Sequence, residues 1–257
     1  MSSDLQQKLK EKKQPIEKAL LFLDVASSSK MWKNNATEMN ELLDLFEKAV
    51  NKIMSSFDTK KNFIVKTIGD AYMICFEKWE NALQFAFQIQ QRLVSKDETP
   101  FVLHYENKSM PFAIRIGIAD GPVEQKTVRI QNCNLKDLFG NTVNTASRME
   151  SKVSPVGGIG ITCLSKRSKV LQNFVDKLIE FLEKHKFNFK ILSFKQDCGK
   201  NNIANTMIKN AVNSDKQKTR SDRLITQLQE NYSCAHSEKL HGVDDVEICF
   251  QIEVNKY

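Results

Sequence analysis

The chain has 257 residues and a formal net charge of +7, and hydrophobic residues make up 41% of it. This composition excludes a wholly disordered chain, and no apolar run reaches the roughly 18–20 residues that a membrane-crossing helix needs. The length suits one domain that carries an insertion. The positive charge either suits a polyanionic partner, such as nucleotide phosphates, nucleic acid or anionic lipid, or is spread over the solvated surface.

Strand and helix patterns alternate in the first half of the chain. The predicted elements, in order, are a strand over 19–23, a helix over 37–57, a hairpin of 63–67 with 71–76, and a helix over 78–95. The helices follow from apolar residues at helical spacing, and the strands follow from short apolar runs. Asp24 ends the first strand, and Gly69-Asp70 forms the turn of the hairpin.

The second half of the chain continues this alternation. The predicted elements are a strand over 112–118, a strand near 126–131, a helix through 145–149, a strand over 158–163, a helix over 168–187 and a strand over 246–252. Gly121-Pro122 is expected to break the strand that begins at residue 112. Residues 195–240 are polar and rich in Asn, Lys and Ser, and no element is assigned to them.

The order of these elements predicts an α+β fold, a ferredoxin-like sandwich with helices on one face of an antiparallel sheet. A polar tail or helix at 1–17 is expected to precede one domain over 18–257. That domain is expected to contain an extended C-terminal insertion at about 165–240, because this stretch is long for a connection between strands.

Cysteine usage indicates the compartment. No C-x-x-C pair occurs, which argues against a zinc site. The six cysteines are Cys75, Cys133, Cys163, Cys198, Cys234 and Cys249. The polar, lysine-rich start of the chain lacks the apolar core of a secretion signal. We therefore expect a cytoplasmic protein whose thiols are reduced and packed as small hydrophobic groups.

Two aspartates stand where predicted strands end or turn. In a ferredoxin-like sheet the first strand and the central hairpin can lie side by side, which would bring Asp24 near Asp70. Carboxylate oxygens suit hard divalent cations, and two cations can activate an attacking oxygen and stabilise a leaving phosphate. An aspartate at a strand end or in a Gly-Asp turn also serves purely structural purposes, so the pair alone leaves both interpretations open.

Around these aspartates the sequence resembles the class III nucleotidyl cyclases, the adenylate/guanylate cyclase family. Four segments match in the family's order: Phe22–Val25, Lys66–Met73, Arg115–Pro122 and Asp137–Glu150. The resemblance covers about residues 20–163, and the chain from residue 246 onward resembles the family's last strand. It implies the fold of a cyclase catalytic domain.

The resemblance implies that Asp24, Asp70 and the backbone of Val25 bind two divalent cations, Mg²⁺ or Mn²⁺. The implied reaction is attack of the ribose 3′-oxygen on the α-phosphorus of a nucleoside triphosphate. Pyrophosphate leaves and a 3′,5′-cyclic nucleotide forms. One cation would lower the pKa of the 3′-hydroxyl group, and the other would neutralise the triphosphate.

Lys66 and Asp137 match the positions that read the base in this family. A lysine can donate to N1 of adenine and a carboxylate can accept from the 6-amino group, so the pair implies ATP and an adenylate cyclase. Guanine offers the opposite polarity, and guanylate cyclases carry Glu and Cys at these positions. Asn144 matches the residue that orients the ribose, and Arg148 matches the residue that stabilises charge on the α-phosphate. Their spacing places both on one helix face.

In the family, two catalytic domains pack head to tail and each active site takes residues from both. Because this chain carries both half-sets, the resemblance implies a C2 homodimer with two equivalent sites. The stretch 123–128 is bulkier and more charged than the small, glycine-rich residues that the family usually has there. That region often helps to form the dimer contact, so we expect a modified dimer.

Two segments match the places where the family binds the triphosphate. The first follows Asp24-Val25, where the family commonly has a glycine and this chain has Ala26 and then Ser27, Ser28 and Ser29. Their N–H groups and hydroxyls suit phosphates at a helix start. The second is His241-Gly242, which aligns with a family Lys-Gly turn, and a protonated histidine can serve there. Alternatively, Lys239 or another lysine substitutes, or His241 is a solvated loop residue.

Two other functions stay open. A pyrimidine cyclase of bacterial antiviral defence, making cCMP or cUMP, would keep the chemistry and change the base, although Lys66 and Asp137 favour adenine. A catalytically degenerate, nucleotide-binding regulatory module is the second alternative, but degenerate members usually lose residues that this chain keeps. No RNA-reading motif is visible, so nucleic acid is not an expected partner.

Overall fold

The computed structural model describes residues 15–94, 101–130, 133–164, 168–185, 187–193, 232–234 and 248–254. The strands are β1 (Ile16–Val25), β2 (Phe63–Ile68), β3 (Ala71–Phe76), β4 (Val102–Tyr105), β5 (Lys108–Pro111), β6 (Ile114–Ile130), β7 (Cys133–Phe139), β8 (Gly158–Cys163), β9 (Asn188–Ser193), β10 (Tyr232–Cys234) and β11 (Ile248–Glu253). The helices are α2 (Ser28–Asn34), α3 (Ala36–Met54), α4 (Trp79–Val94), α5 (Asn141–Arg148), the π-helix η1 (Met149–Val153) and α6 (Ser168–Lys184). Within these described ranges, no helix combines the length and the apolar character needed to cross a membrane.

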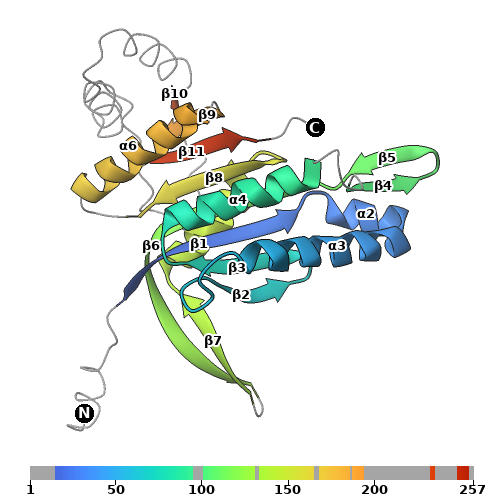
Figure 1. The fold of residues 1–257 in the computed structure, drawn as a ribbon, viewed down its shortest axis with the longest axis horizontal. Coiled ribbons are helices and arrows are strands. Elements are labelled where there is room, and N and C mark those ends of the chain that lie inside the picture. The colour runs from blue at the N-terminus through green and yellow to red at the C-terminus, as the bar shows by residue number, and fades with distance from the viewer. Residues whose placement is uncertain are drawn as a thin grey trace.

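A large mixed sheet organises the chain (Figure 1). Its strand order is β10-β9-β11-β8-β6-β1-β3-β2, and β7 pairs with the outer part of β6. β1 runs antiparallel to both of its neighbours, β3 and β6, whereas β8 runs parallel to β6. The end of β1 at Asp24 therefore lies between two strands whose residues can reach it from either side.

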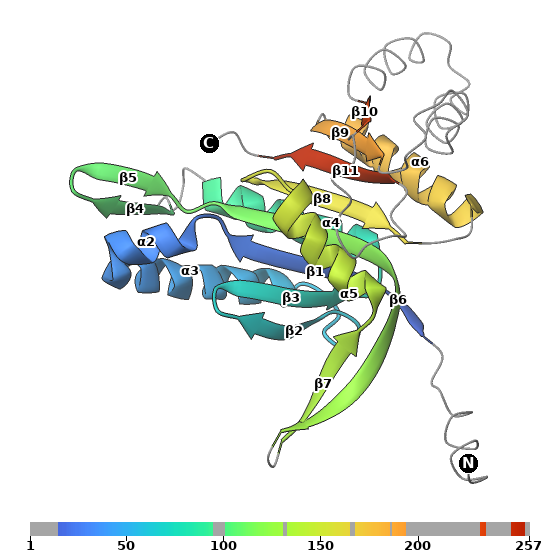
Figure 2. The same ribbon diagram turned by 180° about the vertical axis from the view of Figure 1, so that it is seen from behind.

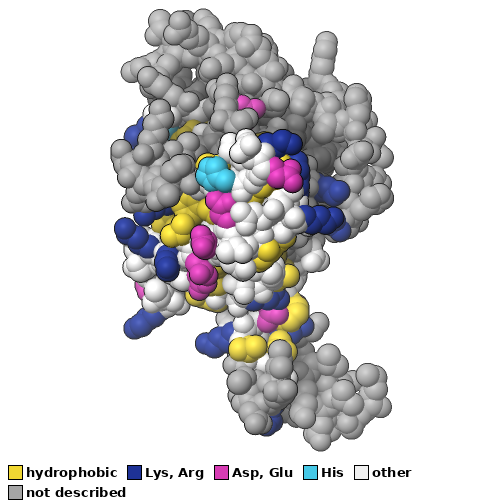
Figure 3. Space-filling model, turned by 90° about the vertical axis from the view of Figure 1, so that its right-hand side faces the viewer, with side chains coloured by type: hydrophobic (Ala, Val, Ile, Leu, Met, Phe, Trp, Pro, Cys, Tyr) yellow, Lys and Arg dark blue, Asp and Glu magenta, His cyan; other side chains and the backbone are white. Residues whose placement is uncertain are grey.

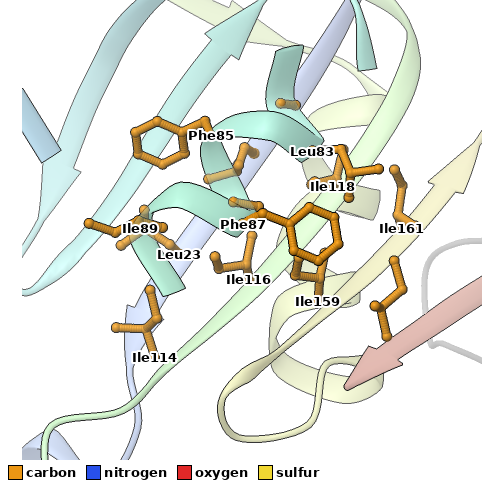
Figure 4. Close-up of a cluster of buried hydrophobic side chains, with 14 of the residues drawn as sticks. Leu23, Leu83, Phe85, Phe87, Ile89, Ile114, Ile116, Ile118, Ile159 and Ile161 are labelled. Atoms are coloured by element: carbon orange, nitrogen blue, oxygen red, sulfur yellow. The ribbon is translucent and has the colours of Figure 1, made fainter. Parts of the chain in front are cut away.

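Alternation along β1 separates the two faces of the sheet. Leu21 and Leu23 point into a core built with α3, α4 and α6, whereas Leu20 and Phe22 pack on the opposite side with a residue of α5. Figure 4 shows part of the first core, where side chains of α4 meet isoleucines of β6 and β8. We call the side covered by α5 the second face (Figure 2). Because side chains alternate along a strand, Asp24 belongs to the second face.

The α+β sandwich with an antiparallel-rich sheet is confirmed, with two corrections. The expectation that the helices cover one face is wrong, because α5 and η1 lie on the second face. The sheet is also not purely antiparallel, because β8 pairs parallel to β6. Two parallel strands need a long crossover between them, and β7, α5 and η1 form that crossover.

Two glycines make room for the crossover. Gly117 on β6 and Gly160 on β8 lie opposite each other in the ladder. A Cβ atom on Gly117 would overlap the backbone nitrogen of Glu150 and the carbonyl oxygen of Ala146. A Cβ atom on Gly160 would lie 2.8 Å from the carbonyl oxygen of Met149. The lack of side chains therefore lets the backbone of α5 and η1 rest directly on the sheet.

β6 continues through Gly121-Pro122, so the predicted break is wrong. Up to Val123 it pairs with β1, and from Glu124 onward it pairs with β7. The outer part of β6 and β7 form a two-stranded arm that leaves the sheet (Figures 1 and 2). The strand tolerates Pro122 because the proline lies where the strand changes partners, and the Thr142 hydroxyl donates to the Pro122 carbonyl at 2.6 Å.

The structure adds detail near both expected domain limits. β1 begins at Ile16, inside the tail expected over 1–17. α6 lies in the expected insertion, yet Phe174 and Leu178 of this helix are buried in the first core. β9 also lies in that segment, and it pairs with β11 within the main sheet. The first part of the segment 165–240 therefore belongs to the body of the domain.

The hairpin of β4 and β5, which the sequence did not predict, is attached to the start of α3. Its turn places Glu106 and Asn107 at φ values of 44° and 59°, which a tight primed turn requires. The backbone N–H of His104 donates to Glu38 at 2.7 Å, and its ring Nδ1 lies 3.0 Å from the same carboxylate. These hydrogen bonds lower the pKa of Glu38. Figure 3 shows acidic side chains beside a histidine on this end of the molecule.

The first prediction concerns Asp120 on β6, whose side chain is largely removed from water. Burial, followed by the negative charges of Glu17 and Glu80, raises the Asp120 pKa from 3.8 to about 7. Between these values the folded state holds a proton that the unfolded state has lost, so stability falls as pH rises from about 4 to about 7. Asp120→Asn should remove this loss.

Urea unfolding at about pH 5 and about pH 8 measures the effect. At about pH 8 the variant should gain roughly 1–2 kcal/mol in the free energy of unfolding over the parent chain, and little at the lower pH. An equal change at both pH values would show that the Asp120 carboxyl does not titrate as described.

The second prediction concerns the glycine contact. Gly117→Ala should destabilise the fold by about 2–3 kcal/mol, because its methyl group meets backbone atoms that cannot rotate away. Gly121→Ala is the matched control on the same strand, since its Cβ would meet side-chain atoms of Leu164 and Thr142 at 3.0 Å. Urea unfolding should give a clearly smaller loss for the control. Equal losses would argue against a special contact at Gly117.

Candidate active site

Asp24 and Asp70 meet at one end of the β1–β3 ladder. The two strands pair as far as Leu23 opposite Tyr72, so the residues that follow Leu23 and precede Tyr72 lie at the same end. Gly69 adopts a φ of 63°, which permits the tight turn that carries Asp70. Burial and the negative charge of Asp70 raise the pKa of Asp24. The two carboxylates, distant in sequence, therefore act on each other electrostatically.

The donor set at this point fits divalent cations. One carboxylate oxygen of Asp70 is buried and has no hydrogen-bond partner, an arrangement that costs free energy unless a ligand satisfies it. In the described part of the chain, no three His, Cys, Asp or Glu side chains gather around one point. Two carboxylates suit Mg²⁺ or Mn²⁺, since such ions keep positions for water and for substrate phosphates.

Arg115 is a site residue to which the sequence reasoning gave no role. It lies opposite Asp24 in the β1–β6 ladder, and its Nη2 atom is 3.3 Å from the Asp24 carboxylate. Its Nε atom lies 3.2 Å from Glu150 of η1. Burial raises the pKa of Glu150 to about 7, although the Arg115 charge acts in the opposite direction. The available signal was a single charged residue, Arg115, within the apolar stretch 112–118, and the β1–β6 register places it beside Asp24.

Lys66 and Asp137 contact each other directly. Lys66 Nζ donates to both carboxylate oxygens of Asp137, at 2.8 and 2.9 Å. The lysine extends from β2 and the aspartate from β7, so the arm is what brings the two together. A register shift between Ile64 and Lys66 precedes the lysine on β2. The side chains are 41% and 20% exposed, which leaves the pair accessible to a ligand.

Asn144 and Arg148 lie on the outer side of α5. Thr142, Thr145 and Ala146 of the same helix are buried against the sheet, whereas Asn144 and Arg148 are exposed. Their side chains make no hydrogen bond or ion pair with the described residues of this chain. One chain therefore presents them outward rather than to its own carboxylates.

The serine segment after β1 forms the start of α2. Ser27 has a φ of 63°, the left-handed conformation that glycine adopts most easily, and its side chain caps no N–H group. The next two residues begin the helix, with Ser28 half-buried and Ser29 exposed. Val25 ends β1 opposite Ile114, and its backbone forms a hydrogen bond that lowers the pKa of Asp24. His241, the other predicted triphosphate residue, lies outside the described residues.

Comparison with curated proteins shows both adenylate and guanylate cyclases among the relatives. Guanylate cyclase 32E of Drosophila melanogaster is 33% identical over 135 residues, which is 51% of this chain and 11% of the relative. Adenylate cyclase of Schizosaccharomyces pombe is 28% identical over 156 residues, which is 56% of this chain and 9% of the relative. The chain thus spans about a tenth of the length of these relatives.

Solved structures contain the same fold. The catalytic core of a rhodopsin-guanylyl cyclase with converted specificity, in complex with ATPαS, is 26% identical, with a TM-score of 0.51. The match covers 73% of this chain and 92% of that one. Residues 11–210 match the family described as the adenylate and guanylate cyclase catalytic domain. Since that match spans most of the sequence and the fold agrees with it, the chain belongs to the family of adenylate and guanylate cyclase catalytic domains.

Proposed function

We propose that the chain is a nucleotidyl cyclase that converts ATP to 3′,5′-cyclic AMP and pyrophosphate. The observation that carries the choice of ATP is the contact between Lys66 and Asp137. The ribose 3′-oxygen would form a bond to the α-phosphorus while the bond from that phosphorus to pyrophosphate breaks. The 3′-hydroxyl proton would leave to solvent or to a phosphate oxygen.

Asp24, Asp70 and the Val25 carbonyl would hold two divalent cations, Mg²⁺ or Mn²⁺, which lower the pKa of the 3′-hydroxyl and neutralise the triphosphate. Arg115 lies beside Asp24 and would pair with triphosphate oxygens there. Ser27, Ser28 and Ser29 follow the same strand end and would contribute N–H groups and hydroxyls to the phosphates. Positioning and charge stabilisation would supply the rest of the rate enhancement.

The base would insert where Lys66 and Asp137 now contact each other. Lys66 would donate to N1 of adenine, and Asp137 would accept from the 6-amino group. Both side chains are already close together, and the pair is partly exposed, so only a modest free energy opposes its replacement by the base. Guanine would present a donor to the lysine and an acceptor to the carboxylate, which leaves polar groups unpaired.

A second copy of the chain would complete the site. Asn144 and Arg148 are exposed on α5 and make no hydrogen bond or ion pair with the described residues of their own chain. In a C2 dimer they would orient the ribose and stabilise charge on the α-phosphate at the partner's carboxylates. Exposed apolar side chains near the arm offer surface for such a contact, with Ile68 57%, Leu135 51% and Phe139 38% exposed.

The third prediction concerns the base. Incubation with ATP, GTP, CTP or UTP in the presence of Mn²⁺, followed by mass spectrometry, should give cyclic AMP as the main product. Lys66→Glu combined with Asp137→Cys reverses the donor and acceptor pattern, and it should lower turnover of ATP relative to GTP by about 10-fold or more.

Products of the four-triphosphate assay other than cyclic AMP would point to other functions. Cyclic CMP or cyclic UMP as the main product would identify a pyrimidine cyclase. Cyclic GMP from the parent chain would show that the Lys66–Asp137 pair does not select adenine. No cyclic product with any triphosphate, despite nucleotide binding, would identify a regulatory nucleotide-binding module.

The fourth prediction concerns the shared site. Asp70→Ala and Arg148→Ala should each lower turnover by on the order of 100-fold or more, whereas Asp44→Ala, an exposed acid on α3, should change it little. Mixed chains carrying Asp70→Ala and Arg148→Ala should regain part of the activity, since one of the two sites in the heterodimer is intact. Heterodimers that form without regaining activity would contradict a site shared between copies.

A further inference from the structure

Glu150 is a buried acid for which the proposed reaction has no use. It is 8% exposed and belongs to the π-helix η1, directly after α5. Its Oε1 atom lies 3.2 Å from Arg115 Nε. Burying a carboxylate is costly unless a charge partner compensates, and Arg115 is the basic side chain within ion-pair distance of it among the described residues. The pair therefore depends on an accurate placement of η1 over β6.

Two glycines of the sheet allow η1 to take this position over β6. Gly117 lies two positions after Arg115 and therefore points to the same side of β6. The backbone of Glu150 occupies the space that a Cβ atom at Gly117 would fill, and Met149 rests on Gly160 in the same way. π-helical turns are uncommon and often occur at functional sites. Glu150 is therefore held over Arg115 by backbone contacts and not by a flexible loop.

The Arg115 guanidinium has two carboxylate partners, and only one of them would be drawn away by a bound cation. Nη2 faces Asp24, at 3.3 Å, and Nε faces Glu150, at 3.2 Å. If Asp24 turns to a divalent cation, Arg115 loses this partner and keeps the other. A long, flexible side chain released at one end would sample many rotamers, at a cost in entropy when it binds a ligand. The carboxylate at Nε limits this freedom and leaves the Nη groups directed toward the carboxylate end of β1.

We propose that Glu150 is a positioning residue that holds Arg115 ready to bind the triphosphate of the substrate. This inference rests on the proposed function, because it assigns a polyphosphate to the space beside Asp24. Glu150 acts through Arg115 and does not itself touch the ligand. The direction of the effect distinguishes it from simple electrostatics. Removal of a negative charge near a polyanion strengthens binding, whereas removal of the support for Arg115 weakens it.

The test is a double-mutant cycle on ligand binding, which requires no turnover. Inorganic tripolyphosphate with Mg²⁺ is the probe, and calorimetry measures its dissociation constant for the parent chain, Glu150→Gln, Arg115→Gln and the double variant. We expect Glu150→Gln to weaken binding about 5- to 10-fold, and Arg115→Gln at least as much. The double variant should bind no more weakly than Arg115→Gln alone, because the acid has nothing left to position.

Controls separate positioning from folding. Glu77→Gln removes an acid from a more exposed ion pair, with Lys61 at 3.1 Å, at the far end of β3, and it should leave binding unchanged. Urea unfolding of each variant checks the fold. Should Glu150→Gln fail to fold, Glu150→Asp keeps the charge and shortens its reach, and it should weaken binding in the same way.

Three results would overturn the inference. The first is tighter binding by Glu150→Gln. The second is a double variant whose fold-loss in affinity is the product of the two single losses, which is an additive cycle in free energy. The third is no binding of tripolyphosphate by the parent chain. The cycle is independent of the product assay. A cyclic product together with an additive cycle would reject the role of Glu150 and keep the cyclase. A non-additive cycle without any cyclic product would keep the role of Glu150 and reject the cyclase.

Discussion

The close approach of α5 and η1 to the glycines of β6 and β8 fixes the geometry of the second face. Any side chain at Gly117 would overlap backbone atoms of Ala146 and Glu150, so the helix rests closer to the sheet than other residues permit. From this position Glu150 reaches Arg115, and the opposite side of α5 carries Asn144 and Arg148 outward. One packing contact therefore relates the carboxylate end of β1 to the helix that the proposed dimer would use.

Five charged groups of the site lie within ion-pair distance of an opposite charge. Arg115 stands between Asp24 and Glu150, and Lys66 pairs with Asp137. The Lys66–Asp137 pair is partly exposed and contributes about 0–1 kcal/mol, because water and mobile ions compete for the same charges. Such a pair holds its side chains near their working positions and yet yields to a stronger ligand. Glu150, by contrast, is buried. One buried oxygen of Asp70 has no hydrogen-bond partner among the described residues, and the same holds for Arg115 Nε and Glu150 Oε1, which face each other as an ion pair.

Patterns among neighbouring residues in the sequence predicted those helices and hairpins whose formation depends mainly on neighbouring residues. The spacing of apolar residues predicted α3, α4 and α6, and the Gly69-Asp70 turn predicted the hairpin of β2 and β3. The same rules missed β7, whose charged residues obscure the alternation, and they ended β6 at Gly121-Pro122. That strand persists because it passes from one partner to another, which is a property of the sheet and not of the local sequence.

The sequence by itself determined the residue types of the site, the family to which they point and the strand end and hairpin turn that carry Asp24 and Asp70. Only the tertiary structure decided which side α5 covers, that Arg115 shares its charge with Glu150, and that Lys66 meets Asp137 across 71 positions of the chain. The reason is physical. Such contacts depend on strand register and on the depth at which a helix sits, and both are set by packing between segments that are far apart in sequence.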